Sequence, residues 1–195
     1  ELDVAFDVEE AYGSISPVES NFTAQTVPFS FSLKNLDYIK SIKTVELKDT
    51  KFQFTMGLNE GFENFNIADN SKLVLSFPDA FVFSTTGMKL PNGVNQSTTR
   101  ANDFEITSFE AFSTTESWVL PISEVKINQT VDNGNLYFST QATVKAVTGN
   151  KENYLTVKGT EGIDLIAAVK KLCTNGREVR LQATDIIKLN IEDVT

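Results

Sequence analysis

Histidine is absent from the chain, and cysteine occurs once in its 195 residues. The absence of histidine excludes Ser-His-Asp triads, Cys-His nucleophiles, histidine-ligated zinc and every other mechanism that needs an imidazole. Cys173 cannot form an internal disulfide, and with no histidine to activate it we expect a small buried side chain rather than a nucleophile. The residues therefore predict no catalytic group, no cofactor, no metal ion and no enzyme.

Long apolar runs and clustered positive charge are also missing. No stretch approaches the roughly 18 consecutive apolar residues that a membrane helix needs, so we expect no transmembrane segment. The 17 basic and 26 acidic residues give a net charge of −9, and Lys170-Lys171 is the one adjacent basic pair. Nucleic-acid binding requires clustered Lys and Arg, so nucleic acid is not an expected partner.

Ser, Thr and Asn are abundant instead: they occupy 52 of the 195 positions, beside 15 Phe. This mixture is typical of strands with one exposed face and of polar loops outside the cell. We therefore expect an exported protein at the extracellular or outer cell surface. Any signal or lipid-anchor segment before Glu1 is expected to have been removed.

Apolar and polar residues alternate along much of the chain, which is the pattern of half-buried antiparallel strands. The Asn-Gly pair in Asp132-Asn133-Gly134-Asn135 predicts a tight turn with positive φ. A second reversal is expected at residues 48–51, which would make a hairpin of the strands on either side. The clearest alternation covers residues 27–33, 52–58, 73–77, 136–144, 179–183 and 187–191.

One segment, from Thr160 to Cys173, has its apolar residues at helical spacing. The predicted fold is therefore all-β, an antiparallel two-sheet β-sandwich of Ig-like or related type with one short α-helix near the C-terminus. We expect a single domain over residues 1–195. Two smaller β-sandwiches over 1–101 and 102–195 are the alternative.

Two polar segments are long for connections, residues 59–71 and 84–102. The second has 19 residues. Loops of this length are uncommon unless they are functional or disordered. The 84–102 segment is therefore a candidate binding surface, and a mobile insertion without a role is the alternative.

Aromatic side chains on an exposed face could stack against sugars, and Trp118, Tyr137 and Tyr154 are the candidate ligand-binding residues. Tyr12 and Tyr38 are further platforms. Trp118 stands beside Val119 and Leu120, so a place in the core is the competing interpretation.

Acidic and amide side chains offer two weaker alternatives. Paired carboxylates could hydrolyse glycosides without histidine, and the candidates by location are Glu60, Glu63, Asp69 and Asp79; solvated surface charge is the competing interpretation. Calcium could bind Asp132, Asn133 and Asn135, although the tight turn already accounts for these residues.

A family likeness lies in residues 39–48 (IKSIKTVELK), 52–58 (FQFTMGL) and 72–81 (KLVLSFPDAF). These segments resemble the repeated β-sandwich modules of surface lipoproteins secreted by gut-dwelling anaerobic bacteria. The resemblance implies an exported or envelope-anchored module used in adhesion or surface assembly, and it carries no catalytic or binding residue. We expect protein or glycan ligands at the cell surface; a glycan-binding module of a polysaccharide-capture system is the alternative function.

Overall fold

The computed structural model of the chain describes residues 14–57, 65–112, 115–160, 180–183 and 189–190. Within them the regular elements are β-strands and one short 3₁₀ turn, η1 (Phe109–Phe112). The strands are β1 (Ser14–Asn21), β2 (Gln25–Leu33), β3 (Ser41–Gly57), β4 (Phe65–Ile67), β5 (Ser71–Ser76), β6 (Phe81–Phe83), β7 (Val94–Gln96), β8 (Asp103–Ile106), β9 (Trp118–Thr130), β10 (Leu136–Thr148), β11 (Lys151–Glu152), β12 (Tyr154–Thr160), β13 (Arg180–Ala183) and β14 (Leu189–Asn190).

The strands form three antiparallel sheets. Sheet A has the order β1-β12-β4, and sheet B the order β11-β10-β5-β8-β7 with β2 also paired to β10. Sheet C has the order β13-β3-β9-β6, with β14 also paired to β3. The all-β, antiparallel prediction is confirmed, but the described strands divide among three sheets rather than two. The helix expected from Thr160 to Cys173 lies outside the described residues, apart from Thr160 at the end of β12.

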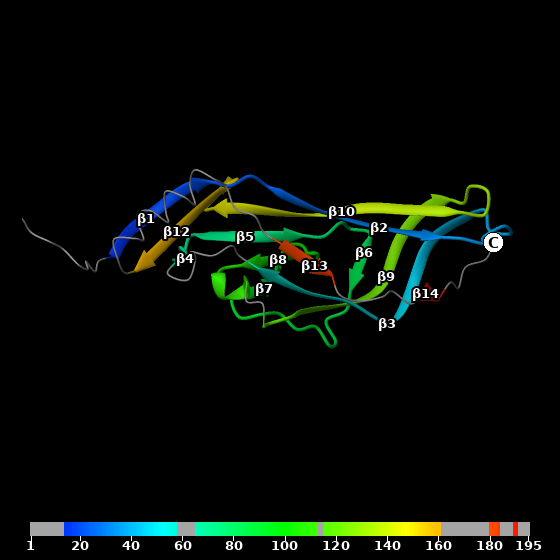
Figure 1. Cartoon of the computed structure of the whole chain (residues 1–195), viewed down its shortest axis with the longest axis horizontal. Coiled ribbons are helices and arrows are strands. Elements are labelled where there is room, and N and C mark those ends of the chain that lie inside the picture. Colours follow the sequence, from blue (N-terminus) through cyan, green and yellow to red (C-terminus); the bar gives the residue numbers. More distant parts are fainter. Residues whose placement is uncertain (1–13, 58–64, 113–114, 161–179, 184–188, 191–195) are drawn as a thin grey trace, which may run out of the picture.

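Figure 1 shows an elongated molecule with sheet A at one end. Two long strand pairs, β2–β10 and β3–β9, run toward the opposite end, which we call the tip. Strands from both sides of residue 101 pair with each other in all three sheets. A boundary at that residue would therefore divide every sheet.

The core extends from sheet A to the space where sheets B and C face each other, and phenylalanine rings fill that space. Phe29 of β2 meets Phe52 of β3 at a centroid distance of 5.2 Å, and Phe52 also meets Phe81 of β6 at 5.2 Å. Tilted and edge-on ring contacts of this kind are favourable beyond the area they bury. The alternation predicted over residues 27–33 is confirmed. Half-buried and exposed residues alternate along β2, and its apolar side packs against the core.

The reversal expected at residues 48–51 is wrong, because β3 runs without interruption through them. The pairing with β9 shifts between Glu46 and Thr50, so that the residues between them face a single residue of β9. Asp49 takes a positive φ of 54°. This geometry is a bulge, which bends a strand without turning it back.

Three hydroxyl groups join sheet A to sheet B. Ser71 Oγ in β5 accepts a hydrogen bond from the buried Thr156 N–H of β12 at 2.9 Å. Thr148 Oγ1 in β10 lies 2.9 Å from Ser71 Oγ and 3.2 Å from Thr156 Oγ1, and it donates to the Tyr154 carbonyl at 3.0 Å. This hydroxyl network supplies partners for polar groups at the junction of the two sheets.

Candidate functional site

The tip is built around the tight turn that connects β9 to β10. The backbone N–H groups of Asp132 and Asn135 each donate to the other residue's carbonyl at 2.8 Å, and Asn133 and Gly134 have φ of 48° and 72°. The positive φ favours glycine at position 134, and a Cβ there would also require the carboxylate of Asp37 to move. The predicted Asn-Gly turn is confirmed. Its two strands then diverge, since β9 joins sheet C and β10 joins sheet B.

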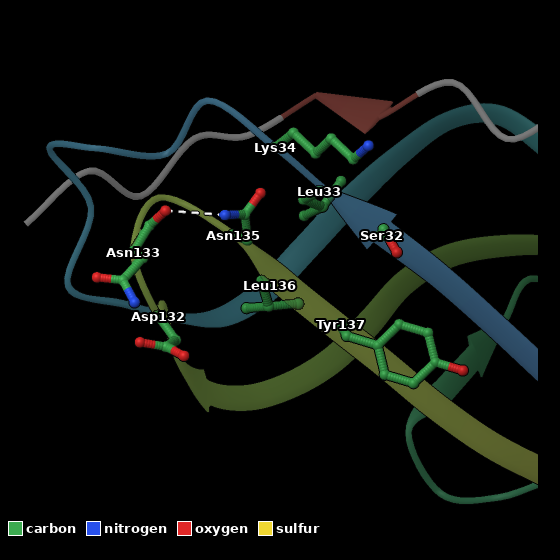
Figure 2. Close-up of a pocket in the computed structure, with 8 residues that line it drawn as sticks. All are labelled: Ser32, Leu33, Lys34, Asp132, Asn133, Asn135, Leu136 and Tyr137. Carbon is green, nitrogen blue, oxygen red and sulfur yellow. Dashed lines mark hydrogen bonds between the residues drawn. The ribbon is translucent and has the colours of Figure 1, made fainter.

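A depression of about 400 Å³ lies beside this turn (Figure 2). Its walls come from the end of β2 and the start of β10, which pair in antiparallel register with Tyr137 opposite Ser32. Hydroxyl, amide, ammonium, carboxylate and phenol groups therefore surround one small space. The lining residues are Ser32, Leu33, Lys34, Asp132, Asn133, Asn135, Leu136 and Tyr137.

Two tyrosine side chains at the tip are exposed to solvent. Tyr38 is 93% exposed and Tyr137 is 63% exposed, and these are the exposed large hydrophobic side chains among the described residues. The Leu36 N–H bonds to the Gly134 carbonyl at 2.9 Å, which fixes the segment carrying Tyr38 against the turn that precedes Tyr137. Tyrosine combines a flat apolar ring with a polar end, and it is enriched in binding surfaces.

The other two aromatic candidates do not present free rings. Trp118 is fully buried, and it stacks on Phe54 with ring centroids 5.4 Å apart, so the core interpretation of this residue holds. Tyr154 is half-buried, and Lys151 Nζ sits 3.4 Å from the centre of its ring. Of the three residues predicted to bind ligand, Tyr137 alone has its ring exposed at a depression.

The residues considered for calcium serve the turn. Asn135 Nδ2 donates to the Asn133 carbonyl at 2.8 Å, and the backbone of Asp132 closes the turn. Within the residues that the structure describes, no group of three or more Cys, Asp or Glu side chains is arranged to hold a metal ion.

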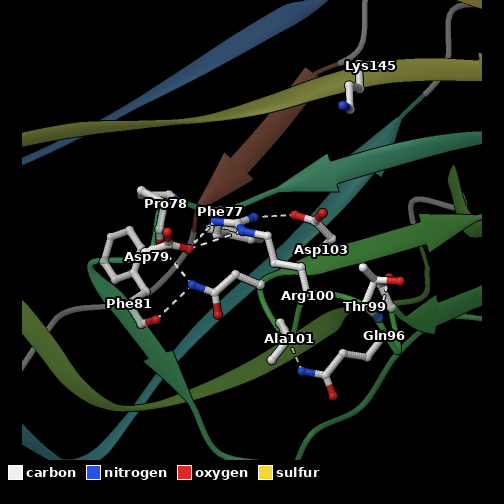
Figure 3. A network of polar contacts seen from close by, with 12 residues as sticks. Phe77, Pro78, Asp79, Phe81, Gln96, Thr99, Arg100, Ala101, Asp103 and Lys145 are labelled. Atoms are coloured by element: carbon white, nitrogen blue, oxygen red, sulfur yellow. Dashed lines mark hydrogen bonds and ion pairs between the residues drawn. The ribbon is translucent and has the colours of Figure 1, made fainter. Parts of the chain in front are cut away.

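Of the four carboxylates considered for glycoside hydrolysis, the two that lie among the described residues, Asp69 and Asp79, are paired with cations. Asp79 accepts hydrogen bonds from Arg100, whose other donors reach Asp103 and, at 2.6 Å, the Phe77 carbonyl (Figure 3). Burial disfavours the charged guanidinium, but the bonds and attraction of the two carboxylates outweigh it and raise the pKa of Arg100. Asp69 pairs with Lys158. Glu60 and Glu63 lie outside the described residues.

The 84–102 segment lies along the sheets. Its backbone forms an isolated bridge from Lys89 to Val119 of β9, and β7 within it pairs with β8. Pro91 and Val94 are buried. The 59–71 segment includes β4 and reaches the start of β5, and residues 58–64 lie outside the described part. The exposed tyrosines thus place the candidate surface at the tip instead of at either long segment.

The outward direction of the Tyr137 side chain could be predicted from the alternation of apolar and polar residues along the strand. Leu136 and Phe138 point inward, so the residue between them must point outward. Tyr38 lies in a turn, where no periodicity applies, and its proximity to Tyr137 depends on the Leu36–Gly134 contact between distant parts of the chain.

In the described part of the chain, no helix has the length and apolar character to cross a membrane. No protein-family model matches the sequence, and no curated protein matches it. Among solved structures, an aerolysin-like protein from Bombina maxima is 12% identical, with 90% of this chain and 99% of that chain covered and a TM-score of 0.20.

Proposed function

We propose that this chain is a non-enzymatic β-sandwich module of the extracellular or outer cell surface, with a role in adhesion or surface assembly. Sheets B and C supply the two layers of the sandwich, since Phe29 from one and Phe52 from the other meet in the core. The abundance of Ser, Thr and Asn supports an extracellular location.

One observation carries the proposed binding role: the exposed large hydrophobic side chains of the described residues, Tyr38 and Tyr137, both lie at the tip. Tyrosine is enriched in binding surfaces, where its ring packs against the partner and its hydroxyl can form hydrogen bonds. The tip is also far from sheet A along the long axis of the molecule (Figure 1). It can therefore contact a partner without hindrance from the opposite end.

Binding of the purified protein to epithelial cells and to immobilised fibronectin, laminin, collagen and mucin tests this proposal. We expect binding to at least one of these surfaces, and the double variant Tyr38→Ala/Tyr137→Ala should weaken it by at least about tenfold. The matched control, Thr85→Ala/Thr86→Ala, removes two exposed side chains outside the tip and should bind like the native protein. Equal binding by both variants, or no binding to any surface, would refute the proposed role of the tip.

A second candidate function is a glycan-binding module of a surface polysaccharide-capture system. The observation that favours it is the position of Tyr137 at the edge of a depression lined by Ser32, Lys34, Asp132 and Asn135. Sugars are bound by aromatic rings that stack on their apolar faces and by hydroxyl, amide and carboxylate groups that bond their hydroxyls. The depression brings both kinds of group together.

A further inference from the structure

The strand pair β2–β10, which we call the ribbon, has one side that faces solvent. This side extends from Tyr137 along the strands, away from the turn. Register and exposure define it: Tyr137 lies opposite Ser32, Ser139 opposite Ser30, and Gln141 opposite Pro28. All six residues are exposed, while the residues between them on β10 are buried or half-buried. We call these six residues the outer face.

The outer face has an unusual chemistry for this protein. The chain carries a net charge of −9, yet none of the six residues is charged. Within the described part of the chain, the side chains of Ser30, Ser32, Ser139 and Gln141 make no intramolecular hydrogen bond. The face therefore offers three hydroxyls, one amide and the phenol of Tyr137, with donors and acceptors available to a ligand.

We propose that the outer face binds a neutral, linear oligosaccharide, with Tyr137 stacked on one sugar ring and Ser32, Ser139 and Gln141 bonding the hydroxyls of its neighbours. This inference rests on the proposed binding role of the tip and names the class of ligand. Residues 137–141 of an extended strand span about 13 Å, so the face accommodates a short run of sugars rather than a single one.

Three features of the face favour a neutral glycan over other ligands. An acidic polymer would need clustered cations, and Lys34 is the one cation that lines the depression, where Asp132 offsets its charge. On the free side of β2, an added protein strand would meet a gap in the row of backbone donors, because Pro28 has no N–H. Side chains on one face of a ribbon repeat regularly, which suits a polymer with a repeating pattern of hydroxyls.

Titration with neutral linear hexasaccharides tests the inference. The probes are β-1,4-linked glucose, xylose and mannose hexasaccharides, with a hyaluronan hexasaccharide as the acidic counterpart, and the readouts are calorimetry and the backbone amide spectrum. We expect at least one neutral probe to bind and to shift the amides of residues 28–32 and 137–141. Tyr137→Ala should raise its Kd by at least about tenfold. Tyr137→Phe keeps the ring and should change the Kd by less than about threefold.

Hydrogen-bonding variants and a control complete the experiment. Ser139→Ala and Gln141→Ala should each raise the Kd by about two- to tenfold, because each removes one hydrogen bond. Thr85→Ala/Thr86→Ala should bind as the native protein does. A native-like amide spectrum for each variant separates lost contacts from lost folding.

The results distinguish failure of this inference from failure of the tip proposal. If no neutral hexasaccharide binds, if the acidic one binds more tightly, or if Tyr137→Ala binds like the native protein, the neutral-glycan assignment is overturned. The adhesive role of the tip then still stands if the protein binds a matrix protein stripped of its glycans and loses that binding in Tyr38→Ala/Tyr137→Ala. Absence of both kinds of binding overturns both proposals.

Discussion

Replacement of Ser71 by alanine tests the hydroxyl network between sheets A and B. In the native protein, Ser71 Oγ accepts the hydrogen bond of the buried Thr156 N–H and also contacts Thr148 Oγ1. Alanine fits the same space but has no acceptor. The Ser71→Ala variant therefore leaves a backbone donor buried without a partner at the junction of the two sheets.

The expected cost follows from what the change removes. A buried donor left without an acceptor costs about 1–3 kcal/mol, which exceeds the net value of an ordinary hydrogen bond. Thr148 keeps its bond to the Tyr154 carbonyl, so its hydroxyl adds little to the loss. We expect a decrease of about 2 kcal/mol in the free energy of unfolding. For a chain of this size, that corresponds to a decrease of roughly 4–8 °C in Tm.

Urea unfolding followed by circular dichroism measures this difference. The matched control is Ser139→Ala, which removes an exposed hydroxyl from β10 and should change stability by less than about 0.5 kcal/mol. Amide exchange gives a local readout, since the Thr156 N–H should exchange faster in Ser71→Ala than in the native protein. If the two variants were equally stable and the exchange of Thr156 were unchanged, the network would have no role in joining the sheets.

Three further outcomes follow from the structure. Gly134→Ala should lower the free energy of unfolding by about 1–3 kcal/mol, because φ at this position is 72° and the added Cβ meets the side chain of Asp37. Thermal unfolding measures this loss, and a Tm equal to that of the native protein would contradict the turn geometry. Trp118→Ala should lower the free energy of unfolding by about 3–5 kcal/mol, measured by urea unfolding. Trp118→Phe should cost much less, because it keeps an aromatic ring in the core and removes a buried N–H that has no partner. The hydrogen bond from Lys145 lowers the pKa of Glu152, so the stabilising effect of this ion pair is present at neutral pH and is lost as pH falls through that lowered pKa. The urea midpoints of Glu152→Gln and the native protein should therefore differ slightly at neutral pH, because the pair is exposed, and should converge in acid below that pKa.

Local features of the fold could be predicted from the sequence, and non-local ones could not. The strand over residues 27–33 and the turn at Asn133-Gly134 depend on side-chain alternation and on the φ that neighbouring residues permit. The division into three sheets depends on which strands pair, and pairs such as β1 with β12 join residues far apart in the chain. The bulge at Asp49 has the polar composition of a turn, so residues 48–51 alone could not distinguish a bend from a reversal.

In the candidate site too, local features could be predicted from the sequence and non-local ones could not. Alternation around Leu136 and Phe138 is enough to place Tyr137 outward, and the Asn-Gly pair is enough to place a turn before it. Burial of Trp118 depends on Phe54 and Phe104, which reach it from other strands. The polar surface of the ribbon also required the register of β10 against β2, because the register decides which side chains share a row.

The direction of the β2–β10 ribbon has a mechanical consequence. Its nine residue pairs lie along the long axis of the molecule, and the tip is at one end of that axis (Figure 1). A tensile force that enters by one of these strands at the tip and leaves by the other at the opposite end would act parallel to both strands, so it would load their hydrogen bonds in shear instead of unzipping them in succession. Under the proposed adhesive role, rupture of the ribbon by such a force would require many hydrogen bonds to fail together.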